Sequence, residues 1–373
     1  MNDIMQNIIS PKMDFKIFTP GPTQIADNIL KIGTQQLPYN RTKKFSKLTY
    51  EIIDKLKYVF QTKGDVAILT SSGTGAMEAS TINFFDQNDL VLIINGGTFG
   101  ERWSQLCKIH NIPFIEIHLG PGENIPLQRI EKKFKSGGFS GLLINAHETS
   151  TGALYDIEKI GKLTNKYNVL FVVDGISSIC ADIFLMDQWH VDVSILSSQK
   201  ALALPPGLSF IALNGKAKEK MNLIPIKSLY FDLKNYLKNQ ERGQMPYTPA
   251  IGLFLMLHKR LEEIEEVSIE VIIKRHYDLA HFFRESIKNL PLEILPKRPS
   301  NAMTALRCSE NINASKIVDL MVTKYNTYLA SNGKPLNEKV FRVSHMGNQT
   351  KNDVKLLVND LKNAVHLERG RLQ

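Results

Sequence analysis

One lysine of this sequence lies in a stretch of apolar and small residues, where its ammonium would lose contact with water and gain no nearby carboxylate. Residues 192–213 read DVSILSSQKALALPPGLSFIAL, and Lys200 is flanked by Ser, Gln, Ala, Leu and Pro. Burial disfavours a charged ammonium and lowers the pKa of a lysine toward neutrality. The pattern therefore indicates an amine meant to react, although in isolation it also fits a lysine whose amine reaches the surface.

Two further patterns suit the same chemistry. Asp174 ends the apolar run FVVDG, where an isolated carboxylate is costly unless it meets a cation, although for Asp174 in isolation a helix-capping role in the following turn is favoured. Residues 71–80, SSGTGAMEAS, place two glycines and hydroxyl groups at an expected helix start, which can hold a phosphate or form an ordinary turn. A phosphate cradle, a carboxylate and an amine together match the phosphate, ring nitrogen and aldehyde of pyridoxal phosphate.

The elements that must position these groups alternate between short apolar strands and amphipathic helices. Seven strands are expected between residues 65 and 214, in the segments DVAILTSS, LVLIING, PFIEIHL, GLLINAHE, VLFVVDG, VSILSSQ and LSFIALN. This alternation predicts an α/β fold, a mostly parallel central sheet sandwiched by helices. The polar candidates follow the ends of these strands, which is the edge where such sheets carry their sites.

The remaining sequence predicts a second, smaller domain. A long helix starting at residue 249 is expected to lead out of the sheet, and residues 276–366 read as helix, strand, strand, helix. Thr350 and Asp353 form a capping pattern at the start of the last helix. We therefore predict an N-terminal arm over residues 1–15, a large domain over 16–265 and a small α+β domain over 266–373.

Composition narrows the class of protein. The chain has 373 residues, 43% of them hydrophobic, and a formal net charge of +9. Its longest apolar runs are too short to cross a bilayer, and its lysines are scattered without a nucleic-acid-binding motif, so neither a membrane nor a nucleic acid is expected as a partner. Three widely spaced cysteines, Cys107, Cys180 and Cys308, indicate neither a disulfide scaffold nor a metal site and predict a cytoplasmic location.

Several short motifs carry a resemblance to a known family. In order along the chain they are FTPGPT (18–23), SSGTGAMEAS (71–80), NGGTFGERW (95–103), HETSTG (147–152), VVDGISS (172–178), SSQKALALPPG (197–207) and YTPAIGL (247–253). In sequence and spacing they resemble the class V pyridoxal-phosphate aminotransferases, in particular the serine-pyruvate and alanine-glyoxylate branch. The resemblance covers nearly the whole chain and implies the fold type I architecture and a homodimer.

The resemblance also implies roles for matching positions. Lys200 would bond to the cofactor aldehyde and shuttle the proton, and Asp174 would pair with the pyridinium nitrogen. Phe99 would stack on the pyridine ring, where relatives often have Trp, and Thr149 would donate to the phenolic oxygen. The phosphate would be held by Thr74, Gly75, Ala76 and Gln199, with backbone amides contributed by Gly75 and Ala76.

Two regions depart from the family pattern. Thr248 matches a threonine that reaches the phosphate of the neighbouring subunit, but Met245 stands where some relatives have a tyrosine, with Tyr247 out of register. Near the start, Asn40 and Arg41 replace a His-Arg pair and could alter substrate preference.

The resemblance implies that Arg342, in VFRVSHMG (340–347), binds the substrate carboxylate, a role that suits a guanidinium because it can form two parallel hydrogen bonds with a carboxylate. His147 and His345 are expected to be structural. The implied activity is transfer of an amino group from alanine or serine to pyruvate or glyoxylate by a ping-pong mechanism. One alternative is transamination of 2-aminoethylphosphonate, and another is a different reaction on the same cofactor, such as decarboxylation or elimination. More remotely, the chain could be a non-enzymatic protein that binds the cofactor or a nucleic acid.

Overall fold

The computed structural model describes residues 15–309 and 311–370, and residues 1–14, which make up most of the predicted N-terminal arm, lie outside them. Its larger sheet has seven strands in the order β2-β10-β9-β8-β5-β3-β4. All seven strands predicted from the sequence are present: β2 (Asp65–Leu69), β3 (Val91–Asn95), β4 (Phe114–His118), β5 (Gly141–Asn145), β8 (Leu170–Asp174), β9 (Val193–Ser197) and β10 (Ser209–Leu213). Only β10 runs antiparallel to its neighbours in this sheet, so the predicted mostly parallel sheet is confirmed.

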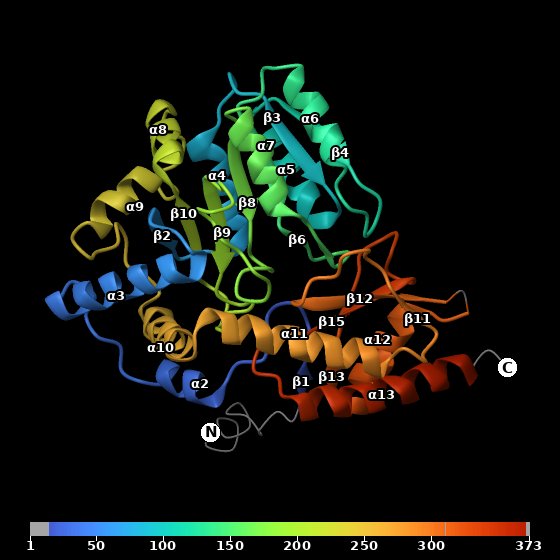
Figure 1. The fold of residues 1–373 in the computed structure, drawn as a ribbon. Helices are drawn as coiled ribbons and strands as arrows, with labels where there is room; N and C mark the ends of the chain where they lie inside the picture. Colours follow the sequence, from blue (N-terminus) through green and yellow to red (C-terminus); the bar gives the residue numbers. More distant parts are fainter. Residues whose placement is uncertain (1–14, 310, 371–373) are drawn as a thin grey trace.

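Helices enclose this sheet, as Figure 1 shows. The strands β3, β5, β8, β9 and β10 are fully buried, which is why they read as continuous apolar runs, whereas the edge strand β4 is partly exposed. α4 packs on β9 and β10, α5 on β3, α7 on β8, and α3 and α9 on β2. The helices of this part are α2 (Asp27–Gly33), α3 (Lys43–Phe60), α4 (Gly73–Phe84), α5 (Thr98–Ile109), α6 (Leu127–Lys135), α7 (Ile157–Lys166), α8 (Gly215–Leu223), α9 (Leu233–Gln240) and α10 (Ile251–Val267).

A second sheet of four strands, in the order β11-β12-β15-β14, is formed by the C-terminal part of the chain. α11 and α13 pack against each other beside it, at the lower right of Figure 1. Its elements are β11 (Leu292–Ile294), β12 (Met303–Cys308), β14 (Ala330–Ser331), β15 (Val340–Ser344), α11 (Ile269–Ser286), α12 (Ala314–Tyr325) and α13 (Lys351–Gly370). The predicted cap of α13 is present, because Thr350 Oγ1 accepts from the amide of Asp353 at 3.1 Å.

The two sheets have separate apolar cores that α11 joins. Its first turns contribute Ile269 and Ile272 to the core of the larger sheet, whereas Leu279 and Phe283 belong to the core of the smaller one. We propose that the two predicted domains correspond to these cores and that the connection runs through the α10–α11 junction.

The N-terminal segment crosses between the two parts of the molecule. β1 (Lys16–Ile17) pairs with β13 (Thr327–Tyr328), and the amide of Ser344 in β15 donates to the carbonyl of Phe18 at 2.7 Å. The short pair β6 (His147–Glu148) and β7 (Ala153–Leu154) follows β5 at the edge that faces the smaller sheet. These segments place chain from both parts beside the carboxyl ends of the central strands.

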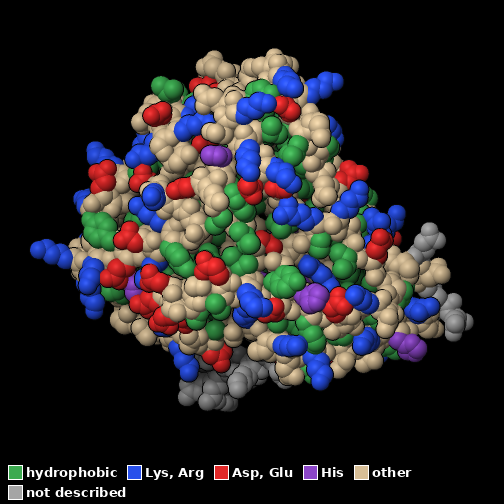
Figure 2. Space-filling view, viewed as in Figure 1, with side chains coloured by type: hydrophobic (Ala, Val, Ile, Leu, Met, Phe, Trp, Pro, Cys, Tyr) green, Lys and Arg blue, Asp and Glu red, His purple; other side chains and the backbone are tan. Residues whose placement is uncertain are grey.

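The surface in Figure 2 carries intermixed acidic and basic side chains on the face shown. Within the described residues, no helix is both long enough and apolar enough to cross a membrane. The three cysteines are free and buried, and burial raises the pKa of each thiol to about 12.

Candidate active site

Lys200 lies in the loop that follows β9, and its side chain is buried. Its Nζ donates to the carbonyl of Pro20 at 2.7 Å, and Thr23 Oγ1 donates to the Lys200 carbonyl at 3.1 Å. Burial lowers the pKa of Lys200 to about 8, against the opposing effect of the nearby Asp174 carboxylate. The loop therefore holds an amine whose neutral form is accessible near physiological pH.

The FTPGPT motif explains how this amine is enclosed. Gly21 has φ +139°, and a Cβ at this position would lie 2.6 Å from Lys200 Nζ. Any larger residue would have to displace the amine, so the glycine leaves the space that Lys200 fills. The motif was recognisable in the sequence, but its contact with a lysine 180 positions away was not.

Asp174 closes β8 and is also buried. Its Oδ2 accepts from Asn145 Nδ2 at 2.6 Å and its Oδ1 accepts from the amide of Ile176 at 2.8 Å. Burial raises the pKa of this carboxyl to about 7 in the absence of a cationic partner, so a cation placed against it would be strongly favoured. Sequence analysis missed Asn145, which ends β5 directly opposite Asp174 in the sheet register.

The predicted phosphate cradle lies at the start of α4, whose first residue is Gly73. The amides of Gly75 and Ala76 both donate to the carbonyl of Ser72, so a phosphate would share these two donors with it. The amides of Gly73 and Thr74 precede the first intrahelical bonds and are oriented by the helix itself. The buried Gln199 Oε1 has no hydrogen-bond partner in the described part of the chain.

Phe99 is positioned by a buried carboxylate at the start of α5. Glu148 Oε1 accepts from the amide of Phe99 at 3.3 Å, and Oε2 accepts from the amide of Gly100 at 2.9 Å. Glu148 therefore caps α5 from the HETSTG segment. This contact fixes the backbone that presents the Phe99 ring.

Thr149 connects the central sheet to the smaller one. Its Oγ1 lies 2.7 Å from Ser177 Oγ, and its carbonyl accepts from Arg342 Nη1 at 3.1 Å. Ser177 also lies 3.0 Å from His147 Nδ1, and burial lowers the pKa of His147 to about 3. His147 is thus a neutral member of a hydrogen-bonded group at neutral pH, in line with the structural role expected for it.

Arg342 projects from β15 toward this group. Its Nη2 donates to the carbonyl of Ser331 at 2.5 Å, while its buried Nε has no hydrogen-bond partner within the described residues. Burial lowers the pKa of Arg342 to about 10, and Glu148 opposes this effect. His345, three residues further, pairs with Thr304 at 2.8 Å and stays inside the smaller part of the molecule.

Thr248 and its neighbours lie apart from this group. Thr248 is exposed in the loop before α10, and no described contact joins it to the other predicted residues. Tyr247 Oη donates to the carbonyl of Leu229 at 2.8 Å, whereas Met245 is buried. Arg41 donates to the carbonyl of Met245 at 2.9 Å, so the two departures from the family pattern meet in space.

The structure therefore brings most of the predicted residues to one edge of the central sheet. Lys200 is influenced by the charges of Asp174 and Arg342, and a Cβ on Gly73 would lie 2.5 Å from Ile176, next to Asp174. Pyridoxal phosphate fits the groups present, because Lys200 supplies the amine, Asp174 is a buried carboxylate for the ring nitrogen, and the amides at the start of α4 can donate to a phosphate. Thr248 is the one predicted residue that this protomer leaves outside, as far as the described residues show.

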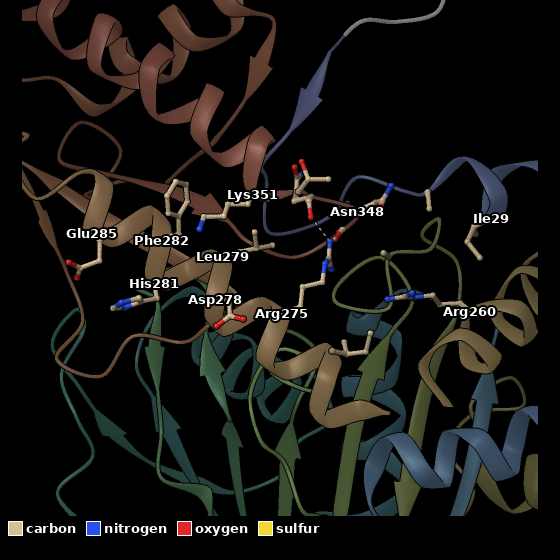
Figure 3. Close-up of a pocket in the computed structure, with 16 residues that line it drawn as sticks. Ile29, Arg260, Arg275, Asp278, Leu279, His281, Phe282, Glu285, Asn348 and Lys351 are labelled. Atoms are coloured by element: carbon tan, nitrogen blue, oxygen red, sulfur yellow. Dashed lines mark hydrogen bonds between the residues drawn. The ribbon is translucent and has the colours of Figure 1, made fainter. Parts of the chain in front are cut away.

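A cavity also lies outside this group of residues. It measures about 820 Å³ and is lined by α10, α11 and the start of α13, without any predicted site residue. In Figure 3, Arg275 points to the turn before α13, where it donates to the carbonyls of Gly347 and Gln349 at 3.0 and 2.5 Å. Arg260 donates to the carbonyl of Leu202, two residues after Lys200, at 3.1 Å. Both arginines thus bind backbone carbonyls of neighbouring loops.

Comparison with known proteins agrees with this geometry. The family model described as aminotransferase class-V matches residues 31–357. A serine-glyoxylate aminotransferase of Arabidopsis thaliana is 32% identical over 353 residues, covering 91% of this chain and 87% of that protein. An L-aspartate-glyoxylate aminotransferase of Paracoccus denitrificans is 30% identical over 343 residues, covering 90% and 87%.

Among solved structures, an aspartate aminotransferase of subgroup IV from Thermus thermophilus superposes with a TM-score of 0.88 at 27% identity, covering 94% of this chain and 99% of the other. This match confirms the predicted fold type I architecture. The family match likewise confirms pyridoxal phosphate as the cofactor. The chain belongs to the class V aminotransferases, enzymes that depend on pyridoxal 5′-phosphate.

Proposed function

We propose that this aminotransferase moves the amino group of alanine or serine to glyoxylate or pyruvate by a ping-pong mechanism. The observation that carries the proposal is Arg342, a partly buried guanidinium whose charge acts on Lys200 and whose buried Nε is unpartnered within the described residues. The names of the Arabidopsis and Paracoccus relatives both include glyoxylate, which supports that acceptor.

Arg342 binds the carboxylate that α-amino acids and 2-oxo acids share. A carboxylate between Arg342 Nε and Nη2 would receive two parallel hydrogen bonds and would replace the carbonyl of Ser331 as the partner of Nη2. Because β15 belongs to the smaller sheet and Thr149 to the edge of the larger one, the same carboxylate would be held where the two sheets meet.

Lys200 and Asp174 do the chemistry around the substrate Cα. Pyridoxal phosphate, when bound, supplies the aldehyde that takes up the amino group and a ring that accepts electron density from Cα. Lys200 Nζ would remove the proton from Cα of the amino donor and, in the second half of the ping-pong cycle, would return a proton to Cα of the acceptor. Asp174 would accept a hydrogen bond from the protonated ring nitrogen, and Asn145 and the Ile176 amide hold its carboxylate in place.

The remaining predicted residues orient the cofactor. Phe99 would lie against the ring, Thr149 would donate to the phenolic oxygen, and the phosphate would be held by Thr74, Gly75, Ala76 and Gln199. Thr248 would serve the partner subunit of a homodimer, which accounts for its exposure in this protomer. Large apolar side chains lie exposed in the segment before it, namely Leu223, Ile226, Leu229 and Tyr230, as expected of a surface that a second copy covers. We place the enzyme in the cytoplasm, on the basis of its free buried cysteines.

The test measures steady-state rates with alanine, serine, aspartate and 2-aminoethylphosphonate as donors, each against pyruvate and glyoxylate. We expect alanine or serine to give the highest kcat/KM. Parallel lines in double-reciprocal plots would support the ping-pong order, and intersecting lines would contradict it. If 2-aminoethylphosphonate is the best donor, the enzyme belongs to the alternative activity and Arg342 faces a phosphonate.

A pair of variants tests the anchor itself. Arg342→Lys should raise KM for donor and acceptor at least about tenfold, because an ammonium cannot reproduce the planar fork. Arg307→Lys is the control, since Arg307 lies on β12 of the same sheet but is exposed. Equal KM values for both variants would show that Arg342 does not bind the carboxylate.

A further inference from the structure

Arg102 is a cation beside the cofactor site to which neither the sequence motifs nor the proposed mechanism assigns a role. It lies in α5, three residues after Phe99, and is partly buried. Its Nη1 donates to Thr74 Oγ1 at 3.1 Å, and its guanidinium lies over the Phe99 ring at 5.0 Å from the ring centre. One side chain thus touches both the start of α4 and the aromatic residue expected against the cofactor.

The charge of Arg102 has no counterion there. Within residues 15–309 and 311–370, no carboxylate lies at ion-pair distance from it. The charge of Arg102 acts to lower the pKa of Asp174, but both oxygens of Asp174 already accept hydrogen bonds from Asn145 and the Ile176 amide. Arg102 also adds to the lowered pKa of Lys200, so it stands among like charges. An anion placed beside it would relieve that repulsion.

The phosphate of the cofactor needs such a cation. A phosphate ester carries between one and two negative charges at neutral pH, whereas a helix N-terminus offers the equivalent of about half a positive charge. Lys200 cannot supply the balance, because its amine must react with the aldehyde. Among the described residues, Arg102 is the cationic side chain hydrogen-bonded to the predicted cradle.

We infer that Arg102 is a further cofactor-binding residue, whose guanidinium pairs with the phosphate above Thr74. Thr74 and the Phe99 ring hold the guanidinium in place before the cofactor arrives, which reduces the entropy lost on binding. This inference rests on the proposed assignment of the α4 cradle to the phosphate.

The experiment compares binding of pyridoxal phosphate with binding of pyridoxal, which lacks the phosphate, to the apoenzyme. Affinity is read from quenching of tryptophan fluorescence, so the result does not depend on turnover. Arg102→Gln should weaken pyridoxal phosphate binding by about 10- to 100-fold, as expected for loss of a charge-assisted hydrogen bond, and leave pyridoxal within about twofold. The affinity of Arg102→Lys for pyridoxal phosphate should lie between those of the wild type and Arg102→Gln, because lysine keeps the charge and loses the planar guanidinium.

Lys108→Gln is the matched control, since it removes one positive charge from the same helix, where Lys108 is exposed and lies over Phe114. It should leave both affinities unchanged, and the thermal midpoint of each variant shows whether it folds. Equal weakening of both ligands by Arg102→Gln would mean that Arg102 acts on the ring, and unchanged affinities would mean that it binds no part of the cofactor. Either result overturns the inference.

Two other outcomes separate this inference from the proposals on which it rests. If wild-type apoenzyme binds pyridoxal as tightly as pyridoxal phosphate, the cradle assignment is wrong and Arg102 loses its role with it. If Arg102→Gln leaves cofactor affinity intact but raises KM for aspartate and not for alanine, Arg102 binds a second substrate carboxylate. That result would overturn the inference while leaving the aminotransferase mechanism untouched.

Discussion

Replacing Lys200 by Met should stabilise the apoenzyme, in spite of removing its central catalytic group. Folding buries the amine and lowers its pKa from 10.5 to about 8, so below pH 8 the folded protein must bury an ammonium or release a proton. When folding lowers the pKa of a basic group, it lowers the free energy of unfolding at low pH. This loss of stability disappears as the pH rises above the pKa that the group has in the unfolded state.

The magnitude follows from the two pKa values. At about 1.4 kcal/mol per pH unit, the cost to the wild type is about 3 kcal/mol at pH 7 and about 1.4 kcal/mol at pH 9.5. Met removes this cost and also the bond to the Pro20 carbonyl, worth about 1 kcal/mol at either pH. The variant should therefore be about 2 kcal/mol more stable than wild type at pH 7, and this advantage should fall by about 2 kcal/mol by pH 9.5.

Urea unfolding of both apoproteins at pH 7 and 9.5, at one protein concentration, measures the difference. Lys31→Met is the control, because Lys31 is exposed on α2 and should show no such pH dependence. A stability difference between Lys200→Met and wild type that is the same at both pH values would refute the reasoning, since it would show that burial does not displace the proton of Lys200.

Three further predictions concern the groups around the cofactor. Asp174→Asn should retain pyridoxal phosphate yet slow the single-turnover reaction with alanine at least about 100-fold, because the ring nitrogen loses its charged partner; a near wild-type rate would reduce Asp174 to a capping residue. Affinity for pyridoxal phosphate should fall as the pH drops through the Asp174 pKa of about 7, since protonation removes the negative charge of Asp174. In fluorescence titrations, Asn145→Ala should raise the pH at which the affinity falls by about one unit, because Asp174 loses a hydrogen-bond donor. An unchanged pH profile would exclude Asn145 as the support of Asp174. Thr248→Ala should weaken pyridoxal phosphate binding without changing the mass of the proposed homodimer in sedimentation, and an unaltered affinity would remove Thr248 from the proposed composite site.

Most of the central sheet was predictable from the sequence, and the smaller part of the fold was less so. Strands such as β5 and β8 are five-residue apolar runs bounded by polar residues, so they stand out without any knowledge of the fold. β13 and β14 have two residues each and show no periodicity that could reveal them. α12 did carry a signal that was overlooked, because Asn313 caps its first turn through the amides of Ser315 and Lys316.

The candidate site divides in the same way. Lys200 and Asp174 stand out because ionisable groups in apolar segments are unusual, whatever surrounds them. Asn145 and Arg102 could not be assigned, because their roles depend on which strand lies beside β8 and on how α5 faces α4. Sheet order and helix orientation are set by packing between distant segments, which a single sequence does not display.

The N-terminal segment also has a mechanical consequence. Its Phe18 carbonyl accepts from Ser344, two residues after the proposed substrate anchor, and its Pro20 carbonyl accepts from the Lys200 amine. The backbone from Phe18 to Pro20 thus links β15 of the smaller sheet to the reactive lysine through two hydrogen bonds. We therefore expect that a displacement of β15 on binding a carboxylate would shift the carbonyl that accepts from the Lys200 amine, so that substrate binding and the position of the base would be coupled through this segment.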